Sequence, residues 1–210
     1  MENGQINGMN YTEKQNNLYI VMPPKPRRLK NKQLIFADYP EFTPNLTPSE
    51  IFKLGSFGGT YWRPIYSAVV NKKLKDQHLK YPKSWWKGIH ESQLTTAWNK
   101  YNAKINNYGV KCGSMLEDWE SAGWISEEHP YGWVQWYCDF YQGKRGPDDE
   151  RQINRWIKTA GPKSRFRSAL RNLINKRSAK YDDRSVSPRI RQTLQHWAYA
   201  LTASDLKNNN

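Results

Sequence analysis

The sequence predicts a mostly α-helical, compact domain with a Trp-rich core and a minor extended segment near residues 57–70. Hydrophobic residues make up only 37% of the 210 residues, but 14% are aromatic, including 10 Trp and 13 Tyr. Each large ring buries as much surface as several aliphatic groups, so few rings are enough for a core. In addition, apolar residues recur at helical spacing in the second half, and capping residues stand where those repeats begin.

The chain is expected to begin and end in disordered tails. Residues 1–33 form the first, because the opening stretch is rich in Asn, Gln and Gly. Residues 23–32 within it form a basic arm with five positive charges, no negative charge and three prolines, which favour an extended chain. A nuclear-localisation signal and a solvated tail are the alternatives for this arm. A single globular domain is expected over residues 34–204, and residues 205–210 form the second tail.

The first part of the domain carries two recognisable signals. Thr47-Pro48-Ser49-Glu50 predicts a helix start, with an N-cap, a proline in the first turn and an early acid. Gly58 and Gly59 then indicate either a backbone conformation closed to other residues or a close neighbour. The ring-rich run that follows them is predicted to be a strand or a tight turn.

Helices are predicted along the rest of the domain. Residues 91–105 have helical character, and Ser114 is expected to cap a helix over 115–122 that Gly123 ends. Residues 130–141 are apolar almost all round, which is typical of a buried helix. Three further helices are expected to begin at Asp148-Asp149-Glu150, at Ser164 and at Ser187-Pro188.

The charge is the strongest functional signal. The chain has 33 Lys and Arg against 19 Asp and Glu, a net charge of +14. Residues 141–192 hold 15 of the basic residues and only five acids. Amphipathic helices place such charges away from the core, where arginine forks suit phosphate. The candidate phosphate contacts are Lys144, Arg145, Arg151, Arg155, Lys158, Lys163, Arg165, Arg167, Arg171, Lys176 and Arg177, with Arg63, Arg27 and Arg28 from outside this segment.

These observations favour a nucleic-acid-binding protein, with DNA preferred to RNA as the partner. The alternatives are an enzyme that modifies a base or nucleotide of a nucleic acid, and a packaging or scaffold protein with an acidic protein partner. A basic protein with a merely solvated surface is the remaining interpretation. Tyr61, Trp62, Trp85 and Trp86 are candidates for stacking on bases, although core packing is the favoured role for most of the tryptophans.

Candidate catalytic groups each have a simpler interpretation. Cys112 precedes a predicted helix start, an environment that activates a thiol, but it also suits a small buried residue at a turn. Asp148, Asp149 and Glu150 crowd one helix start and can supply a general acid or base, but acids there also compensate the helix dipole. The simpler interpretation is favoured in both cases. The catalytic residues therefore remain unassigned.

Metal, cofactor and membrane binding are not predicted. The four histidines share no ligand spacing with each other or with Cys112 and Cys138, and no phosphate-binding glycine motif is present. Two cysteines are too few for a disulfide scaffold. The absence of an apolar leader or a long apolar run predicts an intracellular protein, nuclear or cytoplasmic and not secreted. The Asn-rich ends hint at a virus-encoded chain, and the oligomeric state is left open.

Three segments resemble a family of Trp-rich basic proteins from fungi, algae and large DNA viruses. They are residues 57–67 (FGGTYWRPIYS), 110–125 (with VKCGS, WE and GWI) and 130–156 (with PYGWVQWYC and DDERQI). The family has a basic residue after its GWxQWYC motif, whereas this chain has Asp139. The resemblance implies no activity, cofactor or site. It does imply that the three segments belong to one domain.

Overall fold

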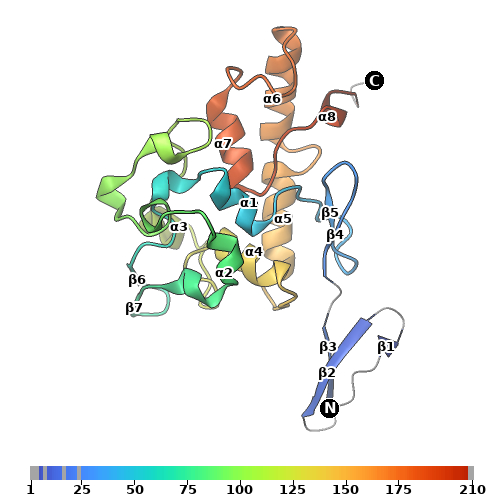
Figure 1. Ribbon diagram of the computed structural model, residues 1–210, viewed down its shortest axis with the longest axis vertical. Coiled ribbons are helices and arrows are strands. Elements are labelled where there is room, and N and C mark those ends of the chain that lie inside the picture. Colours follow the sequence, from blue (N-terminus) through green and yellow to red (C-terminus); the bar gives the residue numbers. More distant parts are fainter. Residues whose placement is uncertain (1–4, 7–8, 16–17, 23–24, 208–210) are drawn as a thin grey trace.

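The helices of the chain gather into one body, which confirms the prediction of a mostly α-helical domain with a Trp-rich core (Figure 1). The computed structural model describes residues 5–6, 9–15, 18–22 and 25–207, with side chains from residue 25 onward. Its sheets are small: β1-β2-β3, β4-β5 and β6-β7 are each formed by neighbours in sequence.

The N-terminal segment contains strands where the sequence predicts a disordered tail. β1 (Gln5–Ile6), β2 (Met9–Gln15) and β3 (Leu18–Met22) form an antiparallel sheet at the lower right of Figure 1, apart from the helices. In the basic arm, β4 (Arg27–Arg28) pairs with β5 (Leu34–Ile35). The rest of the predicted tails, at residues 1–4, 7–8, 16–17, 23–24 and 208–210, lies outside the described residues.

α1 (Pro48–Lys53) begins where the sequence predicts. Thr47 Oγ1 accepts from the Glu50 amide at 3.2 Å, and Glu50 Oε2 accepts from the Thr47 amide at 2.7 Å. The two glycines that follow stand in the short 3-10 helix η1 (Phe57–Gly59) at φ of 57° and 82°. A Cβ on Gly58 would meet the Tyr101 ring at 2.6 Å, so both predicted reasons for glycine hold there.

The extended segment predicted near 57–70 is a strand only at β6 (Ile65–Ser67), which pairs with β7 (Lys72–Leu74) in a hairpin, whereas residues 57–59 lie in η1. After η2 (Gln77–Lys80) and α2 (Lys83–Trp86), the predicted helical stretch 91–105 divides into η3 (Glu91–Gln93), η4 (Trp98–Lys100) and η5 (Ala103–Ile105). The Thr95 and Thr96 hydroxyls donate to the carbonyls of Glu91 and Ser92, at 3.2 and 2.6 Å. Such side-chain bonds compete with a regular helix and accompany the break.

α3 (Leu116–Ser121) begins one residue later than predicted. Its N-cap is Met115 rather than Ser114, because the Asp118 carboxylate accepts from the Met115 amide at 3.1 Å. Gly123 follows the helix at φ 67°, as expected of a glycine that ends a helix.

The core is built around α4 (Trp133–Tyr141), whose residues are buried except Asp139 and Tyr141. Phe42 packs against the rings of Trp136 and Trp156, at centroid distances of 5.6 and 5.1 Å. The Tyr137 hydroxyl donates to the Leu46 carbonyl at 2.8 Å, so the ring's polar end is satisfied inside the core.

The last helices are α5 (Asp149–Ala160), α6 (Arg165–Lys176), α7 (Pro188–His196) and α8 (Ser204–Lys207). Ser164 caps α6 as predicted, accepting from the Arg167 amide at 3.3 Å. α8 occupies residues 205–207 of the tail predicted over 205–210, and residues 208–210 lie outside the described part. Asp205 is buried and accepts from the Tyr199 hydroxyl and the Thr202 amide, which fixes the segment.

Candidate nucleic-acid interface and aromatic cavity

Five of the predicted phosphate contacts are already paired with carboxylates, four of them with a more exposed side chain than Arg167. Arg28 lies 2.5 Å from Glu50, Arg145 lies 2.6 Å from Asp38, Arg151 lies 2.5 Å from Asp148, and Lys144 lies 2.9 Å from Asp139. Arg145 also stacks on the Phe140 ring, with its Cζ atom 3.7 Å from the centroid. Each of these pairs reduces the positive charge offered to a polyanion.

Arg167 is the clear correction to the predicted basic face. It is only 5% exposed, donates to a buried carboxylate of Asp205 and lies 4.0 Å above the Tyr199 ring. Burial alone would raise the pKa of Asp205, but the Arg167 charge and the Thr202 and Tyr199 hydrogen bonds outweigh it, so this pKa is lowered. Arg167 therefore holds α6 to α8 and does not face a partner.

The remaining predicted cations form a smaller group, which we call the basic strip. It consists of Lys158 at the end of α5, Lys163 in the following turn, and Arg165, Lys176 and Arg177 on and after α6. All five are exposed, and none has a carboxylate partner among residues 25–207.

Four other predicted contacts differ from the strip in position or exposure. Arg171 is half-buried on α6, and its Nη2 donates to the Ser168 hydroxyl at 3.1 Å. Arg27 is exposed on β4. Arg155 and Arg63 lie in cavities rather than on an outer face.

A cavity of about 320 Å³ opens between α3, α4, α5, α6 and α7. We call it the aromatic cavity, because seven rings line it: Phe57, Tyr61, Trp119, Trp124, Trp133, Phe166 and Trp197. Its size falls at the lower end of ligand pockets, which span about 300–1,000 Å³. Trp124 is 46% exposed, an unusual position for so large an apolar ring.

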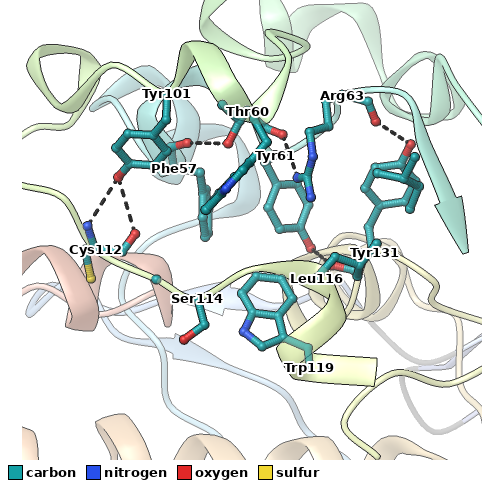
Figure 2. A pocket seen from close by; sticks show the side chains of 13 residues that line it. Phe57, Thr60, Tyr61, Arg63, Tyr101, Cys112, Ser114, Leu116, Trp119 and Tyr131 are labelled. Atoms are coloured by element: carbon teal, nitrogen blue, oxygen red, sulfur yellow. Dashed lines mark hydrogen bonds between the residues drawn. The ribbon is translucent and has the colours of Figure 1, made fainter. Parts of the chain in front are cut away.

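A smaller pocket around Arg63 adjoins the aromatic cavity, and the two share Phe57, Tyr61, Cys112 and Trp119. Figure 2 shows this pocket, with Ser114 and Trp119 across from Phe57 and Tyr61. Arg63 donates to the Thr60 carbonyl at 3.1 Å and lies over the Trp98 ring at 5.2 Å. Burial lowers its pKa, partly offset by the charge of Glu117.

Arg155 is held by rings rather than by a carboxylate. Its Cζ atom lies 5.2 Å from the Trp124 centroid and 5.4 Å from the Trp197 centroid. Arg155 Nη1 donates to the Trp124 carbonyl at 3.3 Å and to Gln152 Oε1 at 3.0 Å. Burial, together with the neighbouring charge of Arg151, lowers the pKa of Arg155 to about 10. A half-buried cation is normally paired with an anion, and Arg155 has no carboxylate partner among the described residues.

The residues that line the aromatic cavity and the Arg63 pocket include Arg63, Arg155 and Arg165 and no carboxylate. The Arg165 guanidinium lies 4.6 Å from the Phe166 centroid, at the first turn of α6. Arg165 thus belongs both to the cavity wall and to the basic strip. The site offers aromatic faces and positive charge together.

His196 supplies a neutral polar group to the same wall. Its Nε2 accepts from the Phe57 backbone N–H at 3.1 Å and from the Gln192 side-chain amide at 3.0 Å, so Nδ1 carries the proton. Burial lowers the pKa of His196 to about 3, which keeps the ring neutral. Nδ1 has no hydrogen-bond partner within the described part of the chain, and the ring stacks on Phe57 at 3.8 Å.

No protein-family model, curated protein or solved structure matches this chain. The site must therefore be interpreted from its own geometry. Residues 57–67, 110–125 and 130–156, the segments that resemble the Trp-rich family, each contribute to the wall of the aromatic cavity. Membership of that family remains a prediction.

The candidate nucleophile lacks an activating environment. Burial raises the pKa of Cys112, outweighing the hydrogen bond with Thr193 and the charge of Arg189. Sγ lies 3.1 Å from the Thr193 hydroxyl, with no histidine or carboxylate among its hydrogen-bond partners in the described chain. Cys138 is fully buried, as predicted for a core residue.

The candidate carboxylates serve the fold. Asp149 is buried, accepting from Trp136 Nε1 at 2.7 Å and from the Gly146 amide at 2.9 Å. Asp148 pairs with Arg151, while Arg155 has no carboxylate partner within the described residues. Glu150 is exposed, and none of the three lines the aromatic cavity.

A third cavity, of about 230 Å³, has compensated charges. His129 Nε2 lies 3.5 Å from Asp139 Oδ2, and Lys144 occupies the other Asp139 oxygen at 2.9 Å. Across residues 25–207 we find no group of three His, Cys, Asp or Glu able to hold a metal ion. Nor does any described helix have the length and apolar character needed to cross a membrane.

Sequence reasoning missed most of the ring wall. It offered Tyr61, Trp62, Trp85 and Trp86 as stacking rings, but Tyr61 and Trp62 are buried, and Trp85 packs on the buried Tyr81 ring at 5.6 Å. Among the rings that line the aromatic cavity, the exposed one is Trp124. Its one sequence signal is its place directly after Gly123, beyond the end of a predicted helix.

Proposed function

We propose that the protein binds nucleic acid, with the phosphates on the basic strip and an unpaired stretch of strand beside the aromatic cavity. The observation that carries this proposal is the position of Arg165, which joins exposed cations without carboxylate partners to a ring-lined wall. Single-strand binding proteins combine the same two elements, a positive groove along the backbone and rings that stack on bases.

The dimensions of α6 suit such a strand. Arg165 and Lys176 are eleven residues apart, which places them on the same side of the helix and about 16 Å apart along it. That length corresponds to about five nucleotides of a stacked strand. The net charge of +14 adds a longer-range attraction to any polyanion. An intracellular location, in nucleus or cytoplasm, belongs to this proposal because nucleic acid is met there.

An enzymatic role is not proposed, because Asp148, Asp149 and Glu150 lie outside the aromatic cavity and burial raises the pKa of Cys112. An acidic protein partner is disfavoured because a polypeptide supplies few flat faces for the ring wall. This partner becomes an outcome of the test below.

The test is a fluorescence-anisotropy titration of labelled single-stranded DNA, duplex DNA and single-stranded RNA of equal length across a salt series. Five strip cations predict a log–log slope of binding constant against salt of about −3.5 for a single strand. Single strands should bind more tightly than the duplex. Lys53→Gln, which changes an exposed lysine on α1, should leave the slope unchanged.

Polyglutamate of similar length serves as the competitor. Displacement of the strand by polyglutamate at equal charge concentration would indicate an acidic protein partner and contradict the proposal. A slope shallower than about −1 would contradict it as well, since that corresponds to one or two phosphate contacts.

A further inference from the structure

The aromatic cavity shows the chemistry of the group that it can take. Four of its seven rings are tryptophans, at positions 119, 124, 133 and 197, and flat π faces of this size favour a flat partner. Trp124 and Trp197 belong to different segments of the chain, and Arg155 Cζ lies 5.2 and 5.4 Å from their ring centroids.

The charge of the wall adds a second requirement. Arg155 and Arg165 line the cavity, no carboxylate does, and neither guanidinium has a carboxylate partner in the described chain. A purely apolar ligand would leave Arg155 uncompensated, and a small inorganic anion would leave the rings unfilled. The ligand should therefore combine one planar group with one anionic group.

The neutral polar groups are consistent with this combination. The Nδ1–H of His196 donates and cannot accept, and the Thr159 hydroxyl lies on α5 one turn after Arg155. Nucleobases carry carbonyl and ring-nitrogen acceptors at their edges. A volume of about 320 Å³ has room for one such unit but not for a stacked run of them.

We infer that the aromatic cavity is a subsite for a single unpaired nucleotide, its base among the rings and its phosphate on Arg155 and Arg165. The inference rests on the proposed function, because the same nucleotide would be one unit of the strand that follows the basic strip. A base that has left its neighbours would enter between Trp124 and Phe57, and Arg165 would hold the adjoining phosphate.

The experiment is isothermal titration calorimetry of the whole protein with nucleoside 5′-monophosphates, the matching nucleosides and inorganic phosphate. The monophosphates should bind at least about tenfold more tightly than either fragment, since only they use both the rings and the guanidiniums. Arg155→Met keeps an apolar side chain next to the Trp124 and Trp197 rings but removes the guanidinium, so it should weaken monophosphate binding about tenfold. It should change nucleoside binding little, and Arg155→Lys should recover part of the loss.

Lys80→Met is the matched control, because Lys80 is an exposed cation in η2 that lines neither cavity, and it should bind like the wild type. Circular dichroism and thermal melting of each variant separate a binding defect from a folding defect. Monophosphate binding no tighter than that of phosphate, or unchanged in Arg155→Met, would overturn the inference.

Oligonucleotide titrations on the same samples separate the two proposals. Salt-dependent strand binding without monophosphate binding at millimolar concentration would overturn the nucleotide subsite and leave the proposed function standing. Monophosphate binding without strand binding would support the subsite and overturn the proposed function. Absence of both would overturn both.

Discussion

The Arg167 site and the aromatic cavity both hold an arginine away from bulk water, but they balance its charge differently. Arg167 lies over the Tyr199 ring and is paired with the buried Asp205. Arg155 lies near two tryptophan rings and has no carboxylate partner in the described chain. The first site contains its own counter-charge, whereas the second has none. Pairing therefore separates the arginines that hold the fold from those available to a ligand.

The largest effect should come from breaking the completed site. Asp205→Ala leaves the Arg167 charge buried without a partner, so we expect a loss of about 3–5 kcal/mol in unfolding free energy. Urea denaturation followed by circular dichroism measures it. The double variant Arg167→Met with Asp205→Leu should recover most of the loss.

Arg155→Met is the opposite case, because it removes a charge that has no carboxylate partner. Its unfolding free energy should change by less than about 1 kcal/mol or increase. Equal losses in Arg155→Met and Asp205→Ala would remove the distinction between the two sites.

The next effect concerns the exposed ring of the cavity. Trp124→Ala should lower the affinity for single-stranded nucleic acid by about 1–3 kcal/mol, the range for loss of one stacked base. Since the ring is 46% exposed, the unfolding free energy should change by less than the cost of removing a core ring, about 3–5 kcal/mol. Trp136→Ala, in the core, should show the reverse pattern. Unchanged strand affinity in Trp124→Ala would exclude Trp124 as a stacking surface.

The cavity wall should also add a pH dependence between pH 7 and 5, above the range in which the lowered pKa of Asp205 at the Arg167 site affects stability. The pKa of His196 is lowered from 6.5 to about 3. His196 is therefore protonated below about pH 6.5 in the unfolded chain, but only below about pH 3 in the folded chain. This contribution to stability is full above pH 6.5 and is lost as pH falls. Between pH 7 and pH 5 this lowers the free energy of unfolding by about 2 kcal/mol.

Urea denaturation at a series of pH values measures that decrease, and His196→Gln should remove it. His90→Gln, at an exposed position, should retain it. An NMR titration that places the pKa of His196 near its usual value would contradict this account of the wall.

The smallest effects belong to the strip. Lys163→Gln, Lys176→Gln and Arg177→Gln should each make the salt slope for single-strand binding shallower by about 0.7. Stability should change by less than about 0.5 kcal/mol, because these side chains are exposed. The anisotropy series across salt measures the slope. A full-sized change in slope from Lys53→Gln would mean that the whole surface, and not the strip, attracts the strand.

Local signals in the sequence predicted much of the helical framework. Thr47 and Ser164 cap the helices assigned to them, and the apolar run at 130–141 contains the buried helix α4. These features depend on residues within one or two turns, so a single chain displays them. The stretch 91–105 also shows a local helical pattern, but in the structure it divides into three short 3-10 helices. The Thr95 and Thr96 hydroxyls donate to backbone carbonyls between the first two of them, and such bonds compete with a regular helix.

The site depended on contacts that no local pattern displays. Arg167 lies on the charged side of a predicted amphipathic helix, but its partner is 38 residues further along. The ring wall is assembled from segments as distant as Phe57 and Trp197. Residue types and net charge predicted the class of partner that we propose. Only the fold distinguishes the paired cations from those without carboxylate partners.

The separation between Arg167 and Asp205 also has a consequence for the order of events during synthesis. The ribosome makes Arg167 thirty-eight residues before Asp205. Until then α6 carries one more uncompensated charge than in the finished protein, and its inner side cannot pack without burying that charge alone. The emergence of α8 would end that state by neutralising the charge and allowing α6 to close onto the core.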